Sequence, residues 1–225
     1  MMYEYRGSHF KLEEVQSWSR KGTHYQITDI RTESSDLWLP DTYGSGRVDS
    51  LDMRDDRVLP IDRHAKERSY PEVRVLHIPK GITEFRIRND LFPKLERVEI
   101  DEENEIFSTD GRLIFAKESG NYYGKKEKWL KYCPVCRGDV IEIPNDVKGI
   151  SAKAFSGTQY RQICFPEEEI DIDLKAFDGS VWLDGAVYPI VIGICCIRLI
   201  RRQNAWKFPG WYAGFMPDFL TGAVR

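Results

Sequence analysis

A short apolar pattern recurs at a fixed interval in the second half of the chain. Its first copy reads Ile143-Pro144, Val147, Ile150 and Ala154-Phe155-Ser156-Gly157, and 22 residues later come Phe165-Pro166, Ile172 and Ala176-Phe177-Asp178-Gly179. One unit of this length is too short to bury its own apolar side chains, so the units have to stack. A period between about 20 and 30 residues is typical of solenoid proteins. The recurrence therefore predicts a stack of similar coils.

Short strands are predicted at the start of each coil. The segments 73–79, 95–101 and 160–166 align on a closing Pro or Asp, with apolar residues six, three and one positions before it. The last two apolar positions are an i, i+2 pair, so they lie on one face of a strand. The residue between them points to the opposite face. We therefore expect each coil to present one row of outward-facing side chains.

One coil is predicted to carry an insertion. The segment 107–115 places Asp110-Gly111 between strand-forming residues, which favours a β-hairpin with a two-residue turn. We interpret residues 105–128 as a hairpin insert that projects from the stack.

The two ends of the chain are predicted to cap the solenoid. Residues 1–72 are expected to form an N-terminal capping region with a possible degenerate repeat around 36–51, and a short helix over 10–18 is suggested by apolar spacing. Residues 73–180 hold the repeats. Residues 181–225 are rich in Trp, Tyr and Phe and are expected to close the other end, because a solenoid needs terminal units with a polar outer face.

These motifs carry a family resemblance. A strand ending in Ile-Pro, then Val, Ile and Ala-Phe-x-Gly, together with a Phe-Ser-x-Asp-Gly-x-Leu insert, resembles the BspA-like class of bacterial leucine-rich repeats over roughly residues 73–179. The resemblance implies an α/β leucine-rich-repeat solenoid with a narrow parallel sheet on its concave side and irregular caps. It also implies an adhesive or protein-binding role without catalysis, in a class that is often exported.

Composition bears on partners and compartment. The net charge of -3 comes from 33 basic and 36 acidic residues, so no overall field favours nucleic acid or an anionic membrane. Basic and aromatic residues between 198 and 211 could stack bases, but we favour an aromatic cap there. The first residues lack the apolar run that is typical of a signal peptide, and the longest apolar stretch, 186–197, is too short for a membrane span. We predict a cytoplasmic protein, or a cell-surface one if the chain is a fragment.

Evidence for metal or catalytic chemistry in the sequence is limited to one cysteine pair. Cys133 and Cys136 have the spacing of half a zinc site, but no second Cys-x-x-Cys follows, and Cys195-Cys196 are adjacent. We favour structural cysteines, with no cofactor and no catalytic residues. A metal-binding or enzymatic module that uses Cys133 and Cys136, or the N-terminal region, is the alternative.

The outward-facing row of the strands is the candidate site. The expected partner-binding residues in and beside this row are Arg74, His77, Arg97, Glu99, Glu142, Arg161 and Gln162. A merely solvated sheet face is an equally good interpretation of the row. Its mixed charges favour a protein partner over a polyanion, and solenoids commonly bind partners on such a surface. We therefore predict a non-catalytic protein-interaction or adhesion-type scaffold.

Overall fold

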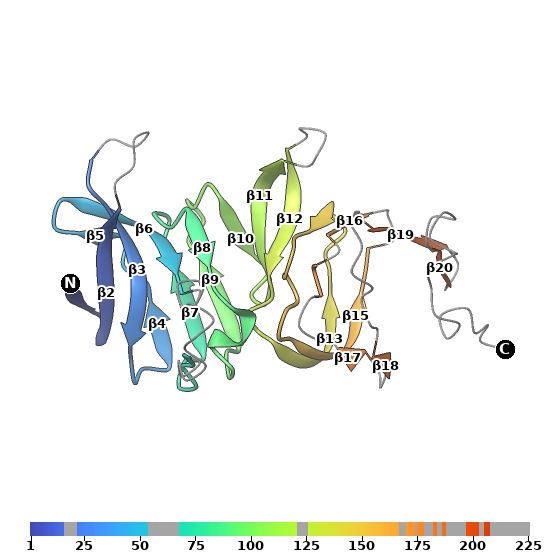
Figure 1. The fold of residues 1–225 in the computed structure, drawn as a ribbon, viewed down its shortest axis with the longest axis horizontal. Coiled ribbons are helices and arrows are strands. Elements are labelled where there is room, and N and C mark those ends of the chain that lie inside the picture. The colour runs from blue at the N-terminus through green and yellow to red at the C-terminus, as the bar shows by residue number, and fades with distance from the viewer. Residues whose placement is uncertain are drawn as a thin grey trace, which may run out of the picture.

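Strands make up nearly all of the regular structure in this protein. The computed structural model describes residues 1–15, 22–53, 68–120, 126–166, 170–173 and 175–177, and the backbone of four short strands beyond them. Figure 1 shows an elongated body whose strands follow one another along the long axis in nearly the order of the sequence. The one helix in these ranges is the 3-10 turn Asn89–Leu91. None of the described helical structure is long and apolar enough to cross a membrane.

Parallel strands form one side of the stack, which we call the first wall. In its N-terminal part, a central strand pairs in parallel with two neighbours. In its C-terminal part, two further strands pair in parallel with each other. The strands are β4 (Asp36–Trp38), β7 (Val75–Ile78) and β9 (Arg97–Ile100), followed by β13 (Arg137–Glu142) and β15 (Gln159–Cys164). Leu37, Leu76 and Val98 lie opposite one another and are all buried. Stacked coils, predicted from the recurring pattern, are thereby confirmed.

A second set of parallel strands, the second wall, lies across the core. It also has an N-terminal and a C-terminal part, each of three strands. They are β3 (His24–Arg31), β6 (Gly46–Asp52) and β8 (Glu84–Arg86), then β12 (Lys126–Tyr132), β14 (Gly149–Ile150) and β16 (Ile170–Ile172). A coil thus runs along the first wall, turns, and returns along the second wall as a short strand.

The expected α/β class is therefore wrong. Between Ile78 on the first wall and Glu84 on the second, the chain makes a turn that contains Pro79 and Gly81. Both residues disfavour a helix, and the segment is too short for a stable one. The returning residues instead satisfy their backbone groups by pairing with the equivalent strand of the preceding coil, β6. The solenoid is mostly β, with parallel strands on both walls.

The N-terminal region is built from strands that continue the stack. β1 (Met2–Tyr5) and β2 (Ser8–Val15) form an antiparallel hairpin, and β2 pairs with β3. The helix expected over 10–18 is wrong for residues 10–15, because Phe10 and Leu12 are buried and Lys11 between them is exposed, which is the period of a strand. Residues 16–18 lie outside the described ranges. β5 (Thr42–Tyr43) forms a small hairpin with β6.

The hairpin insert differs from the expectation in its turn. β10 (Phe107–Thr109) pairs with β11 (Ile114–Gly120), and Thr109 lies opposite Ile114, so the loop has four residues instead of two. Its Gly111 carbonyl accepts a hydrogen bond from the Val98 N–H of β9 at 2.8 Å. The Asp110-Gly111 turn is therefore docked against the first wall. The hairpin that rises above the neighbouring strands in Figure 1 is formed by β11 and β12.

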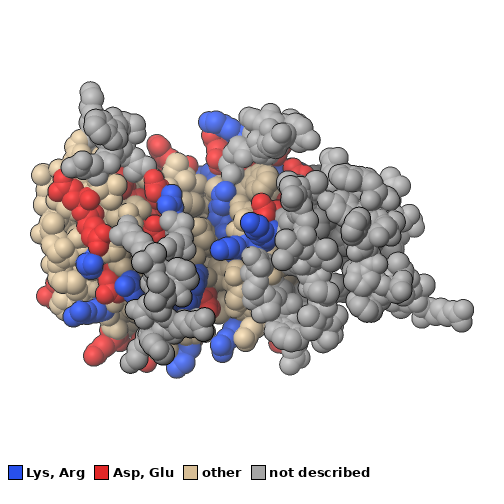
Figure 2. Space-filling model, in the orientation of Figure 1, with Lys and Arg blue, Asp and Glu red and all other residues tan. Residues whose placement is uncertain are grey.

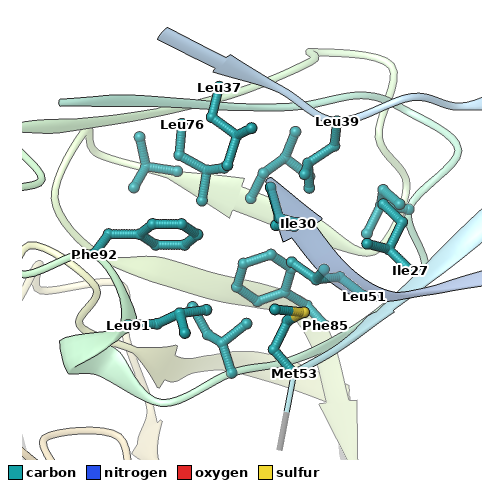
Figure 3. Close-up of a cluster of buried hydrophobic side chains, with 14 of the residues drawn as sticks. Ile27, Ile30, Leu37, Leu39, Leu51, Met53, Leu76, Phe85, Leu91 and Phe92 are labelled. Carbon is teal, nitrogen blue, oxygen red and sulfur yellow. The ribbon is translucent and has the colours of Figure 1, made fainter. Parts of the chain in front are cut away.

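Two apolar clusters fill the space between the walls. Figure 3 shows the N-terminal cluster, in which Leu76 of the first wall and Phe85 of the second point towards a shared interior with Phe92. The C-terminal cluster surrounds Phe155. β11 contributes to both: Ile114 packs in the N-terminal cluster and Phe115 in the C-terminal one. The inserted hairpin thus separates two cores and borders each of them.

The C-terminal end is described only as backbone strands. These are β17 (Trp182–Leu183), β18 (Ala186–Val187), β19 (Ile197–Arg202) and β20 (Ala205–Lys207). β19 pairs antiparallel with β16, and β20 with β19. The remainder of the predicted aromatic cap, 181–225, lies outside the described residues.

Candidate functional site

Five side chains line up on the outer face of the first wall, and we call them the ladder. They are Arg6, Trp38, His77, Arg97 and Glu99. Register sets their order: Trp38 of β4 lies opposite His77 of β7, which lies opposite Glu99 of β9. Since the inward-facing neighbours of these residues belong to the core, their own side chains face solvent. Arg6 reaches the ladder from the β1–β2 turn.

Ring stacking and ion pairs connect successive side chains of the ladder. The rings of Trp38 and His77 are parallel to within 6°, with centroids 3.6 Å apart. His77 Nδ1 lies 2.9 Å from Glu99 Oε2, and Glu99 Oε1 lies 2.6 Å from an Arg97 guanidinium nitrogen. A carboxylate only accepts, so the His77 Nδ1–H donates this bond. The ladder is therefore a continuous set of contacts across three strands.

His77 is the most enclosed member of the ladder. Its side chain is 11% exposed, whereas that of Glu99 is 43% exposed. Among the described residues its Nε2 has no hydrogen-bond partner, and it lies 3.6 Å from Asp36 Oδ1. The indole of Trp38 covers one side of the imidazole ring. These neighbours fix the ring in place, so His77 orients the exposed residues on either side of it.

Beyond the docked turn, the first wall continues with a different surface. A shallow hollow of about 350 Å³ lies over the ends of β13 and β15, between Glu142 and Cys164, and is also lined by Asp110, Ile143, Pro144, Asn145 and Phe165. Arg112 of the turn holds this part of the wall, because it donates to the Val140 carbonyl at 3.1 Å and to the Tyr160 hydroxyl at 3.3 Å. The Val140 side chain is exposed.

The predicted site residues fall into separate groups. Arg74, His77, Arg97 and Glu99 lie on or beside neighbouring strands of the first wall, and Arg74 pairs with Glu96 at 3.0 Å. Glu142 belongs to the hollow on the far side of the docked turn. Arg161 and Gln162 lie on β15, and their side chains are outside the described part of the structure. The partner-binding role of all seven residues stays a prediction.

Two ladder residues, Trp38 and Arg6, were not predicted from the sequence. Trp38 stands one position before Leu39 in the degenerate repeat, which is the same position that His77 holds before Ile78. Extending the alignment to that repeat would have found it. Arg6 had no signal in the sequence, because its position depends on how the β1–β2 hairpin packs against β4.

Charges of both signs are mixed on the molecular surface. Figure 2 shows Lys and Arg side chains interspersed with Asp and Glu on the visible face. Within the ladder, Arg97 is likewise adjacent to Glu99. A polyanion such as nucleic acid needs an extended run of cations, and the ladder offers none.

The cysteine pair is built into the core region. Burial raises the pKa of the Cys133 thiol strongly and that of the Cys136 thiol as well. The Cys133 thiol points to the Val135 carbonyl, with sulfur 3.5 Å from oxygen. A thiolate is the form that binds metal or reacts, so burial disfavours both kinds of chemistry here. Among the residues that the structure describes, no three His, Cys, Asp or Glu side chains converge as metal ligands would.

Comparison with known proteins gives limited likeness. No protein-family model and no curated protein sequence matches the chain. A leucine-rich repeat protein from Eubacterium ventriosum, solved by crystallography, is 22% identical over 47% of this chain, with a TM-score of 0.36; the chain spans 27% of that protein. The pneumococcal vaccine antigen PcpA is 11% identical to this chain. The match covers 81% of this chain and 70% of the PcpA chain, with a TM-score of 0.32.

Proposed function

We propose that this chain is a non-catalytic repeat scaffold, of the BspA-like bacterial type, that binds a protein partner across the outer face of the first wall. The ladder is the observation that carries the proposal. It places an aromatic ring and charges of both signs on three adjacent parallel strands, whose backbones lie about 4.8 Å apart. A surface that is aromatic, mixed in charge and fixed in place suits a protein partner, because little side-chain entropy remains to be lost on binding.

Support for a non-catalytic role comes from two largely buried histidines, each paired with a carboxylate. His24 Nδ1 lies 2.6 Å from Asp49 Oδ2, and both side chains are buried between β3 and β6. His77 is covered by Trp38 and paired with Glu99. Both imidazoles thus connect strands. The alternative, a module using Cys133 and Cys136, is disfavoured because burial keeps both thiols protonated.

The N-terminal region also supports a scaffold over a separate enzymatic module. β4 pairs with β7, and β6 pairs with β8, so strands of this region belong to the same two walls as the repeats. Leu37 and Leu51 pack in the same apolar cluster as Leu76. The partner-binding face therefore includes part of the N-terminal region.

Affinity capture with a matched pair of charge reversals tests the proposal. Arg97→Glu changes the ladder, whereas Arg86→Glu makes the same change on the second wall, where Arg86 is similarly exposed and pairs with Glu84. We expect proteins captured from native extract by the wild type to be retained by Arg86→Glu. Arg97→Glu should weaken their capture by about tenfold or more, as for a central interface charge. Arg161→Glu is expected to act in the same direction.

Folding of the variants is checked by circular dichroism and thermal melting, because exposed substitutions of this kind usually change stability by less than about 0.5 kcal/mol. Identical capture by the wild type and the correctly folded Arg97→Glu and Arg161→Glu variants would refute binding on this face.

A further inference from the structure

Arg6 occupies an unusual place at the N-terminal end of the ladder. Its guanidinium carbon lies 4.1 Å from the centroid of the Trp38 ring and 5.6 Å from that of Tyr5. His77 stacks in parallel against Trp38. A guanidinium and an imidazole cannot share one face of an indole at these distances, so they cover opposite faces. Arg6 and His77 therefore lie on the two faces of the Trp38 ring, and the Trp38 residue is still 36% exposed.

The backbone holds Arg6 in this position at a conformational cost. Tyr5 pairs with Ser8, so Arg6 and Gly7 are the two central residues of the β1–β2 turn. Their φ angles are 48° and 76°, as a type I′ turn requires. Asn, Asp or Gly is the usual residue at the position of Arg6, since other side chains crowd the backbone there. A long arginine kept in this conformation is the kind of strained residue that accompanies function.

Arg6 differs from the other arginines of the ladder region in its partners. Arg74 pairs with Glu96, and Arg97 pairs with Glu99. For Arg6, the described part of the chain provides ring contacts alone: no described carboxylate pairs with its guanidinium, and no described oxygen accepts a hydrogen bond from it. Its planar set of N–H donors is exposed and held by two aromatic rings. Such a group is preorganised for an acceptor supplied by another molecule.

We infer that Arg6 is a carboxylate-binding site, which receives one Asp or Glu side chain of an extended, otherwise uncharged segment in the protein partner. The inference rests on the proposed function and names the partner's chemistry at one end of the ladder. A guanidinium accommodates one carboxylate through two parallel hydrogen bonds. The partner's chain would then cross the strands from Arg6 towards Arg97.

The surroundings of Arg6 favour a peptide over other anions. Asp36 and Glu99 lie farther along the same face, and they would repel a polyanion that extended past Arg6. A nucleobase or a sugar ring would bind an aromatic residue by stacking, yet both faces of Trp38 are covered. One fixed cation beside acidic neighbours instead suits a segment that carries one carboxylate among uncharged residues.

Titration of the full chain with defined peptides tests this inference. The probe is a fluorescent synthetic peptide of Thr residues with one central Glu (the Glu–Thr peptide), compared with its counterpart in which Gln replaces the Glu (the Gln–Thr peptide) and with an oligothymidylate. Binding is followed by fluorescence anisotropy for the wild type, Arg6→Gln, Arg6→Lys and Arg86→Gln. Arg86→Gln is the matched control, since it removes the same charge from the second wall.

We expect the Glu–Thr peptide to bind the wild type and Arg86→Gln equally, and to bind Arg6→Gln at least about tenfold more weakly. Arg6→Lys should fall between them, because an ammonium group cannot form the two parallel bonds. The Gln–Thr peptide should not bind. In protein labelled with ¹⁵N at arginine, the side-chain resonance that is absent from Arg6→Lys should shift on addition of the acidic peptide.

Several results would overturn the inference: absence of Glu–Thr peptide binding to the wild type, equal binding to Arg6→Gln, or tighter, Arg6-dependent binding of the oligothymidylate. If these occur while Arg97→Glu still weakens partner capture, the proposed binding face stands and the role of Arg6 is wrong. If the peptide result holds but capture is insensitive to Arg97 and Arg161, Arg6 binds a carboxylate and the proposed face is wrong.

Discussion

Single buried side chains connect the turns of neighbouring coils. The Asn89 side chain is almost fully buried, and its amide nitrogen lies 3.0 Å from the Ala154 carbonyl and 2.8 Å from the Ser156 carbonyl. Its oxygen accepts from the Cys133 N–H at 2.9 Å. Asn104 plays the same part in the N-terminal cluster, where it bonds the Ile82 carbonyl and the Phe107 N–H. These amides satisfy backbone groups that the turns would otherwise leave buried without a partner.

Tyr70 gives a prediction for alkaline pH. Burial raises the pKa of Tyr70 to about 12 from a reference of 10.0, and the negative charge of Asp29, 3.2 Å from the hydroxyl, adds to the increase. Between these two pH values the unfolded chain releases a proton that the folded protein keeps. The free energy of unfolding contributed by Tyr70 should be constant below about pH 10 and fall as the pH rises towards about 12.

Urea unfolding of the wild type and Tyr70→Phe, at several pH values from about 9 to about 12, measures this effect. Phenylalanine cannot titrate, so the free energy of unfolding of the variant should decline less steeply. The loss of the hydroxyl bond should make it about 1 kcal/mol less stable at neutral pH. Parallel curves for the two proteins would show that Tyr70 is not responsible for the alkaline decline.

At the scale of elements, each coil is stabilised by contact with the next. The Phe155 ring is fully buried and is parallel to the Phe177 ring of the following coil within 6°, with centroids 5.2 Å apart. Phe177 is only half-buried. Because these residues hold equivalent positions in the recurring pattern, they form one aromatic stack that follows the axis of the solenoid.

The two phenylalanines should therefore differ in their contribution to stability. Phe155→Ala removes a fully enclosed ring and is expected to lower the free energy of unfolding by about 3–5 kcal/mol. Phe177→Ala is expected to lower it by about 1–2 kcal/mol, because part of that ring is already in water. Urea denaturation of both variants provides the comparison. An unchanged melting temperature for Phe155→Ala would mean that its ring is not in the interior.

At the scale of the whole molecule, the inserted hairpin divides the solenoid into two cores. Consecutive residues of β11 face different sides, so Ile114 enters the N-terminal cluster and Phe115 the C-terminal one. The turn of the same hairpin bonds β9 through Gly111 and β13 through Arg112. In a repeat protein each unit is stabilised mainly by its neighbours. Together with the Asn89 hydrogen bonds, β11 therefore connects the two halves so that they stabilise each other.

Truncation of neighbouring residues on β11 should reveal this division. Ile114→Ala is expected to speed amide hydrogen exchange mainly in β7 and β9, whereas Phe115→Ala should speed it mainly in β13 and β15. Each substitution should cost about 2–5 kcal/mol of local stability, since both side chains are fully buried. Exchange measured by mass spectrometry after proteolysis locates the change. A uniform increase over the chain in both variants would show that the protein has one cooperative core.

The sequence predicts a residue's neighbours where these follow from its position in the repeat. Leu76 and Val98 align in the sequence and lie opposite each other in the first wall, and His77 and Glu99 are neighbours for the same reason. Trp38 lies opposite His77 for the same reason, although its repeat has diverged in sequence. Arg6 could not be placed this way, because a turn between antiparallel strands carries it to Trp38 from outside the repeats.

The period of the apolar residues by itself determined that coils stack, since each coil buries its apolar side chains only against its neighbours. The tertiary structure decided what the sequence left open: that the returning segments are strands, that the Asp110-Gly111 turn docks on the first wall, and that Arg6 covers Trp38. These features depend on contacts between segments far apart in the chain. The energy of such contacts overrides local preference, so no window of sequence contains it.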